Sequence, residues 1–190
     1  MWPWGHVASA YLCWLVYARI SDADAEEEVA VVIVAFGALF PDLVDKPLAW
    51  YVGILPTGRS LAHSLVVLVP LAVIIYWIGR KFGHSEWGVA FAIGAISHAL
   101  LDAAPALWRA DDSAMFLFYP LIPIEGYGER GTPTVSELLL GSLSEPYFLI
   151  EIPLAAIALG IWYRRGCPGL GVFRSVVVRL WQVVRPTKIR

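Results

Sequence analysis

Residues 87–108 read WGVAFAIGAISHALLDAAPALW, and this stretch decides the fold class. It is apolar over a length that can cross the hydrocarbon core of a bilayer, which requires about 20 residues of helix. His98 and Asp102 are its only ionisable side chains. The stretch therefore predicts a transmembrane helix that carries two polar groups.

Apolar stretches of similar length recur along the chain, over residues 4–20, 29–55, 61–79 and 147–163. The composition agrees, because 58% of the residues are hydrophobic and 16% are charged, whereas soluble domains are roughly 45–50% apolar. No basic segment precedes the first stretch, so we expect it to remain as a helix and not to be cleaved as a signal peptide. The sequence predicts an all-α, polytopic membrane helix bundle with about five transmembrane helices within residues 1–165.

The polar interruptions predict where helices begin and break. The acidic loop 21–28 opens with Ser21, a capping residue, and predicts a helix start near Asp24, since acids in the first turn interact favourably with the helix dipole. Residues 40–47 read FPDLVDKP, and each proline removes a backbone donor, so we expect a break or kink there. The connection over 109–145 is rich in proline and glycine and predicts a lid or a re-entrant element.

Residues 166–190 form a basic tail. Within it, apolar residues recur at helical spacing opposite Arg174 and Gln182, which is the pattern of an amphipathic helix at a membrane interface. These apolar residues are Phe173, Val176, Val177, Leu180, Trp181 and Val184. The tail and the basic pair Arg80 and Lys81 are expected to be cytoplasmic. The sequence thus predicts a multi-pass protein of the cell (plasma) membrane, with its N-terminus outside and its C-terminus in the cytoplasm.

Asp42, Asp45 and Asp102 lie within apolar stretches and need compensation, because a charged group in the middle of a spanning helix costs about 2.5 to 3.5 kcal/mol. One explanation is ion pairing. Lys46 follows Asp42 by four residues, and Arg59 stands at the head of the third stretch. The other explanation is a functional site, which is the usual meaning of ionisable residues inside a membrane.

His98 and Asp102 are four residues apart and share one face of a helix, where the two side chains can bind one metal ion. A core histidine bonded to a neighbouring aspartate would have the same spacing. The predicted topology brings further histidines and aspartates from other helices to the same side of the membrane, namely His6, Asp42, Asp45 and His63. Ligands converging from four helices at one depth are what a metal site inside a bundle requires. Imidazole and carboxylate ligands without thiolate suit a divalent zinc, manganese or iron ion.

Four short motifs occur in order along the chain: Gly5-His6, GALFPD at 37–42, RSLAHS at 59–64 and SHALLD at 97–102. In these motifs the chain resembles the YdjM-like family of membrane-bound proteins, which are described as metal-dependent hydrolases. The similarity covers roughly the first 125 residues. The resemblance implies that His6, Asp42, His63, His98 and Asp102 form the metal site and that Arg59 lies beside it. Gly58 and Ala62 stand where the family pattern commonly has His and Thr.

Together these features predict a membrane-bound metal-dependent hydrolase in which the metal activates a water molecule. Asp45 is expected to act as the base, and Arg59 to orient an anionic group such as a phosphoester. A site near the outer membrane face makes a lipid or lipid-linked phosphoester the expected substrate, and membrane lipids the expected partners. The net charge of −2 argues against nucleic acid as a partner.

Two other functions remain compatible with the sequence. The intramembrane His and Asp residues could relay protons or bind a transported ion, although the chain shows no inverted repeat of the kind found in many transporters. Alternatively, they could lock the helices of a non-catalytic membrane protein together.

Overall fold

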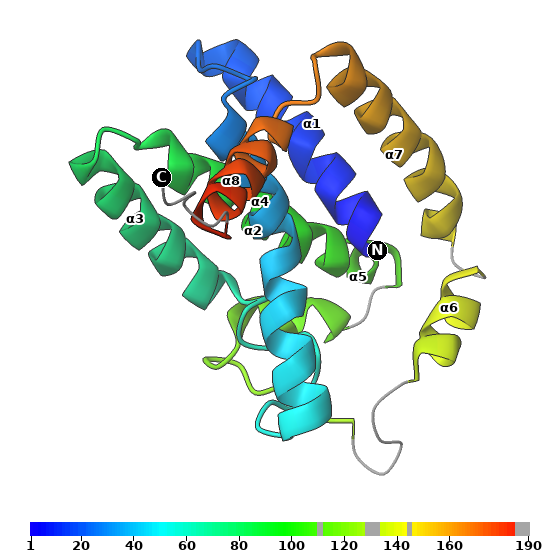
Figure 1. Cartoon of the computed structure of the whole chain (residues 1–190). Helices are drawn as coiled ribbons and strands as arrows, with labels where there is room; N and C mark the ends of the chain where they lie inside the picture. The colour runs from blue at the N-terminus through cyan, green and yellow to red at the C-terminus, as the bar shows by residue number, and fades with distance from the viewer. Residues whose placement is uncertain (110–111, 128–133, 144–145, 185–190) are drawn as a thin grey trace, which may run out of the picture.

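The computed structural model describes residues 1–109, 112–127, 134–143 and 146–184 (Figure 1). Every regular element within these ranges is helical, which confirms the all-α prediction. In chain order the elements are α1 (Pro3–Ser21), α2 (Glu28–Pro47), the π-helical turn η1 (Leu48–Val52), α3 (Leu65–Lys81), α4 (Glu86–Ala103), α5 (Ala106–Arg109), the 3₁₀ turn η2 (Asp112–Phe118), α6 (Val135–Leu143), α7 (Pro146–Arg164) and α8 (Leu170–Val184).

The apolar stretches of the sequence correspond to α1, to α2 with η1, to α3, to α4 with α5, and to α7. The amphipathic pattern in the tail corresponds to α8. Among the helices of the described ranges, none is both long enough and apolar enough to cross a membrane.

Helix α4 lies at the centre of the bundle and contacts α1, α2 and α3, with its most extensive contacts to α2. Two glycines allow α2 and α4 to approach closely. A Cβ atom on Gly94 would lie 2.4 Å from the carbonyl oxygen of Val34, and one on Gly37 would lie 2.7 Å from that of Phe91. Because no larger residue fits at either position, the glycine pair sets the distance between the two helices that carry most of the polar core residues.

Two apolar clusters surround this helix pair. One includes Trp14 and Val34 and joins α1, α2 and α4 to α7, and the other includes Leu68 and Phe91 and joins α3 to α4. Trp14 is fully buried, and its Nε1 atom donates to the carbonyl oxygen of Ala25 at 3.2 Å. The clusters hold the ends of α1, α2 and α4 in fixed positions relative to one another.

The start of α2 differs from the prediction. The helix begins at Glu28 and not near Asp24, because the Glu27 side chain caps it by accepting from the backbone nitrogens of Val29 and Ala30. Asp24 instead accepts a hydrogen bond from the backbone nitrogen of Glu26 at 2.9 Å and stabilises the preceding turn.

The break expected at residues 40–47 occurs at the second of the two prolines. Helix α2 runs through Pro41 and ends at Pro47, where η1 follows. Pro41 is buried, and the packing of α2 on α4 offsets the hydrogen bond that this proline removes. The α-helix therefore continues for about one and a half turns beyond Pro41. As a result, Asp42 and Asp45 both lie on regular helix.

Within the connection over 109–145, the described residues form η2 and α6. Turn η2 packs against α3 and α4, and the Ser64 hydroxyl donates to the carbonyl oxygen of Leu117 at 3.1 Å. The prediction of a lid or re-entrant element also covers 110–111, 128–133 and 144–145, which lie outside the described residues.

Candidate metal centre

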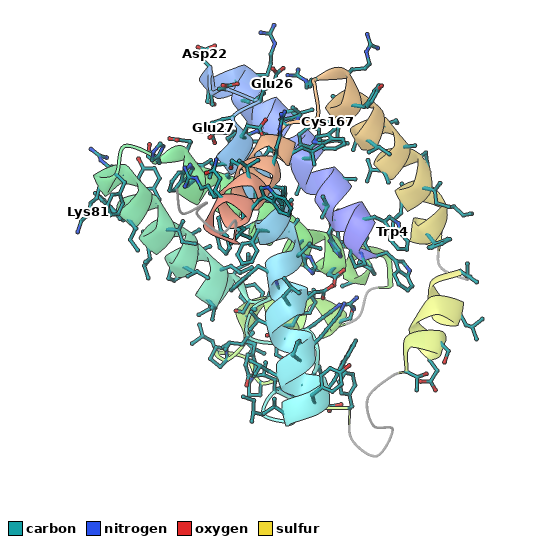
Figure 2. The ribbon with its side chains drawn as sticks, viewed as in Figure 1. Trp4, Asp22, Glu26, Glu27, Lys81 and Cys167 are labelled. Atoms are coloured by element: carbon teal, nitrogen blue, oxygen red, sulfur yellow. The ribbon has the colours of Figure 1, made fainter. Side chains whose placement is uncertain are left out.

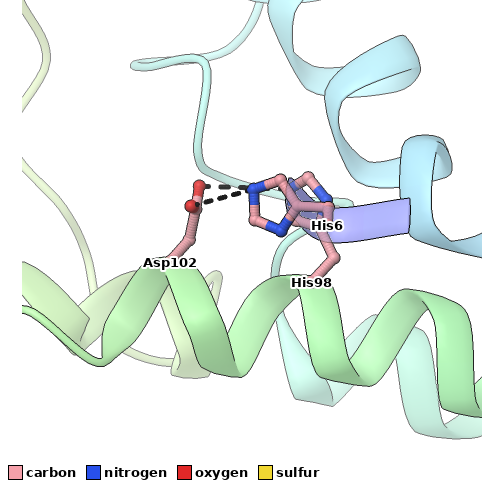
Figure 3. Close-up of side chains that lie close together, drawn as sticks. All are labelled: His6, His98 and Asp102. Atoms are coloured by element: carbon pink, nitrogen blue, oxygen red, sulfur yellow. Dashed lines mark ion pairs between the residues drawn. The ribbon is translucent and has the colours of Figure 1, made fainter. Parts of the chain in front are cut away.

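Histidines and aspartates from four parts of the chain converge where α1, α2 and α4 meet the loop before α3. Helix α4 presents His98 and Asp102 on one face, and the His6 ring from α1 stacks over that of His98 (Figure 3). Asp42 comes from α2, and His63 comes from the loop that precedes α3. The three histidine side chains are completely buried. Sequence reasoning predicted these five residues as metal ligands, and the structure brings them together.

The ring nitrogens of His63 and His98 face each other, with their Nε2 atoms 3.1 Å apart. Each ring is held at its other nitrogen: Nδ1 of His98 donates to the carbonyl oxygen of Ala38 at 2.6 Å, and Nδ1 of His63 donates to Oδ2 of Asp45 at 2.8 Å. In a neutral imidazole with a protonated Nδ1, Nε2 carries a lone pair. Two lone pairs at this distance repel, and a proton or a metal ion between them would remove the repulsion.

Asp42 supplies a third donor atom to this pair. Its Oδ1 atom lies 3.5 Å from Nε2 of His63 and 3.7 Å from Nε2 of His98, and it has no hydrogen-bond partner within the described part of the chain. In a tetrahedral site with metal–ligand distances of about 2.0 to 2.1 Å, neighbouring donor atoms lie about 3.3 Å apart. The three atoms could thus hold a metal ion.

A second group of donors consists of His6, His98 and Asp102, so His98 belongs to both groups. Nε2 of His6 lies 3.2 Å from Oδ1 of Asp102, close enough for an ion pair if His6 is protonated, but neither ring nitrogen of His6 has a hydrogen-bond partner in the described residues. Leaving a buried polar group unsatisfied costs about 1 to 3 kcal/mol. A metal ion coordinated by His6 would remove this cost.

Cations neutralise the aspartates from outside the histidine cluster. Lys46 bonds Oδ2 of Asp42 at 2.6 Å, Nε of Arg59 bonds Oδ2 of Asp102 at 2.6 Å, and the amino group of Met1 bonds Oδ1 of Asp102 at 3.0 Å. The Arg59 side chain is 51% exposed, and the Asp102 carboxylate raises its pKa above the ordinary value. Lys46 and Arg59 therefore both pair with aspartates, as the ion-pairing explanation requires. Oδ1 of Asp42 nevertheless has no hydrogen-bond partner in the described residues. Pairing and the histidine cluster coexist.

Asp45 is completely buried and lies behind the ring of His63. Its two oxygens accept from the backbone nitrogens of Ser60, Ala62 and His63 at 2.7, 2.8 and 3.2 Å, in addition to Nδ1 of His63. A carboxylate that orients a ligating histidine in this way fixes its tautomer and raises its basicity. The geometry supports a positioning role for Asp45, whereas the sequence suggested a base.

Several contacts of the site have no signal in the sequence. The partners of Asp45 and His98 are backbone groups, and residue type does not identify them. The Tyr127 hydroxyl accepts from the backbone nitrogen of Gly58 at 2.8 Å and from Nε1 of Trp50 at 3.1 Å. A Cβ atom on Gly58 would lie 3.1 to 3.2 Å from atoms of Trp50, Lys46 and Tyr127. A side chain at position 58 would therefore require these neighbours to shift by a few tenths of an ångström.

Two further polar residues, His84 and Glu151, lie outside the centre. His84 pairs with Glu86 at 3.2 Å, is half-exposed and stacks on Trp87. Glu151 on α7 is buried and accepts from the backbone nitrogen of Trp2 at 2.9 Å. His84 thus offers a matched control for mutation of the buried histidines.

Comparison with known proteins is consistent with this geometry. A family model described as YdjM inner membrane protein matches residues 1–183, which extends the similarity well beyond the four motifs. No curated protein and no solved structure matches the chain. The chain therefore belongs to the YdjM inner membrane protein family.

Proposed function

We propose that this protein is a membrane-bound metal-dependent hydrolase. The observation that carries the proposal is the 3.1 Å separation of the Nε2 atoms of His63 and His98, with the unpartnered Oδ1 of Asp42 beside them. These three donors would hold a divalent metal ion, with His6 and Asp102 contributing from the other side of His98. When bound, such an ion supplies a Lewis acid that polarises an ester oxygen and lowers the pKa of water.

The donor set narrows the choice of metal. It contains imidazole nitrogens and carboxylate oxygens and no thiolate, which suits zinc, manganese or iron. The two cysteines do not alter this set, since Cys13 points to the exposed surface of α1 and Cys167 lies in the turn before α8.

Hydrogen bonds within the protein fix the orientation of two of the candidate ligands, His63 and His98. Asp45 holds the His63 ring, and the carbonyl oxygen of Ala38 holds the His98 ring, so both Nε2 atoms are directed at one point. We assign Asp45 to positioning, because its oxygens are already filled by four hydrogen bonds and it lies on the far side of His63. Fixed ligand orientation of this kind lowers the reorganisation needed for binding.

The charges favour an anionic substrate. The carboxylates of the three site aspartates are balanced by Lys46, Arg59 and the amino group of Met1, so a divalent ion makes the local charge positive. Arg59 uses Nε for Asp102, and its planar guanidinium can contact a phosphate through the remaining N–H groups. We therefore propose that the substrate is a phosphoester whose anionic group is oriented by Arg59.

A membrane location is supported by the family description and by exposed apolar surface. Along one face of α3, five large apolar side chains are 45–55% exposed: Val69, Val73, Ile74, Trp77 and Ile78. Water-exposed stripes of this kind are unfavourable, whereas lipid would cover them at no cost. We propose a multi-pass arrangement with the N-terminus outside and the C-terminus in the cytoplasm, and a lipid or lipid-linked phosphoester as substrate.

The short distance between His63 and His98 also favours one alternative, because a proton shared by the two rings would satisfy the same lone pairs. In that case the cluster would serve proton or ion transfer across the membrane and not hydrolysis. Metal content distinguishes the two functions.

The test is elemental analysis of detergent-purified protein, followed by hydrolysis assays with p-nitrophenyl phosphate and bis(p-nitrophenyl) phosphate. Near-stoichiometric metal in the wild type, lost in the His98→Ala, Asp102→Ala variant and retained in His84→Ala, is the expected result. Metal without hydrolysis of any phosphoester would refute the enzymatic proposal. No metal after incubation with zinc, manganese and iron would refute the metal centre and favour proton transfer.

A further inference from the structure

The N-terminus of helix α8 is held in place by hydrogen bonds to a residue of α2. Oε2 of Glu28 accepts from the backbone nitrogens of Gly169 and Gly171 at 2.6 and 2.8 Å, so the first residue of α2 caps α8. A carboxylate at this position satisfies backbone donors that the helix cannot pair itself and interacts favourably with the helix dipole. The turn before α8 is held as well, because Nε1 of Trp162 donates to the carbonyl oxygen of Pro168 at 2.8 Å.

Beyond this anchor, α8 leaves its apolar face uncovered. Phe173, Val176, Val177 and Leu180 follow one another at spacings of three, one and three residues, which places them on one side of the helix. Their exposed fractions are 60, 49, 64 and 61%. A helix that packed into the protein core would bury this side. The anchored start and the exposed stripe together indicate that the stripe meets something outside the described chain.

The charges of the tail identify the kind of surface. Residues 166–190 contain four arginines and one lysine but no aspartate or glutamate. At 3.6 residues per turn, Arg174 and Arg179 flank the apolar stripe on its two sides, each about 110° around α8 from the centre of the stripe. A helix with a basic polar face and an aromatic residue on its apolar face is typical of peptides that lie in the plane of an anionic membrane surface.

The acidic residues near α8 do not oppose such contact. Glu26 pairs with Arg165 at 3.2 Å, and Glu28 is occupied by the two backbone nitrogens of α8. Figure 2 shows Glu26 and Glu27 near Cys167, at the end of the bundle where α8 begins. The Glu27 carboxylate caps α2. Most of the negative charge beside the start of α8 is thus paired within the protein.

A second copy of the chain is less suited than an anionic lipid surface to cover the apolar stripe of α8. Pairing two α8 helices through their apolar faces would bring Arg174 and Arg179 of two basic tails close together, with no acid in residues 166–190 to offset the repulsion. An anionic lipid surface instead attracts the same arginines and accepts the apolar side chains.

We propose that α8 docks in the plane of an anionic lipid surface, with Phe173, Val177 and Leu180 in the acyl region and Arg174 and Arg179 near the phosphate groups. The anchor Glu28 and the site residue Asp42 are separated by 14 residues of α2, or about 21 Å of helix. The docking surface and the metal centre therefore lie at opposite ends of α2, and this inference does not depend on the proposed hydrolase.

The experiment uses the full chain with Cys13→Ser and Cys167→Ser, in which one cysteine is introduced for an environment-sensitive fluorophore. The test position is Val177→Cys on the apolar face, and the matched control is Ser175→Cys on the polar face. Each protein is reconstituted into vesicles of phosphatidylcholine alone or mixed with phosphatidylglycerol, and quenching by aqueous iodide is measured. An unchanged melting temperature and elution volume show that each variant is folded.

We expect the label at position 177 to be shielded from iodide in the anionic vesicles and the label at 175 to remain accessible. Replacing Arg174 or Arg179 by Gln should shift the ratio of docked to free helix about fivefold for each arginine. Equal accessibility at 175 and 177 in anionic vesicles would overturn the proposal. Equal shielding of the label at position 177 in detergent, together with disulfide formation between unlabelled Val177→Cys chains under mild oxidation, would also overturn it and identify a second copy as the occupant.

Discussion

Nε2 of His63 lies 3.1 Å from Nε2 of His98, although 35 residues separate the two histidines in the sequence. Each ring is fixed through Nδ1, one by the carboxylate of Asp45 and the other by the carbonyl oxygen of Ala38. The two rings cannot turn away from each other without breaking these bonds. This constraint makes the centre testable through residues that do not themselves contact a metal.

Replacing Asp45 by Asn should weaken metal binding about 10- to 100-fold, because removal of such a partner of a ligating histidine lowers ligand basicity and order. Competition with a chromogenic chelator measures the affinity. The control is Asp24→Asn in the exposed α1–α2 loop, which should leave the affinity unchanged. A wild-type affinity in Asp45→Asn would show that Asp45 does not position His63.

Replacing Gly94 by Ala should destabilise the protein by about 1 to 3 kcal/mol, since the new methyl group would be forced against the carbonyl oxygen of Val34. Thermal unfolding in detergent measures the change in the free energy of unfolding. Gly160→Ala on α7 is the control, because a Cβ atom added there would meet no atom within 4 Å, and alanine is the better helix former. Equal melting temperatures for both variants would contradict the close approach of α2 and α4.

Replacing Arg59 by Lys should weaken the binding of inorganic phosphate about tenfold without removing the metal, because lysine keeps the charge but lacks the planar fork. Equilibrium dialysis of phosphate against the metal-loaded protein measures this effect. Arg80→Lys, in the exposed last turn of α3, should bind phosphate as the wild type does. If Arg59→Lys loses metal as well, Arg59 serves the metal ligands and not the anion.

Removing the metal should lower the melting temperature, because a ligand that binds only the folded state stabilises it by about 2.7 kcal/mol at a hundredfold excess over its dissociation constant. The effect should fade as the pH falls, since histidine ligands bind metal only when neutral and protons then compete for the same nitrogens. Differential scanning fluorimetry with and without chelator over a pH series measures both trends. In the His98→Ala, Asp102→Ala variant, the chelator should make no difference.

The helices were predictable from the sequence, because apolar content over some 20 residues is a local property. The start of α2 was not, since Asp24 and Glu27 are both acidic and only the folded backbone shows that Glu27 reaches the free nitrogens. The break within residues 40–47 was predictable, but not that α2 would continue through Pro41 and end at Pro47. The local preference of Pro41 for a break is overcome by packing against α4, which the sequence around Pro41 does not contain.

The sequence by itself determined that His98 and Asp102 share a face of one helix, because four residues of separation correspond to about one turn. It also determined the amphipathic pattern of α8. Only the tertiary structure decided that His6, Asp42 and His63 meet His98, that Asp45 faces His63, and that the apolar side of α8 stays uncovered. The physical reason is that these relationships depend on backbone groups of Ala38, Ser60 and Ala62 and on the close approach of α2 and α4 at Gly37 and Gly94. A backbone group or a glycine has no side chain whose chemistry would identify its partner in the sequence.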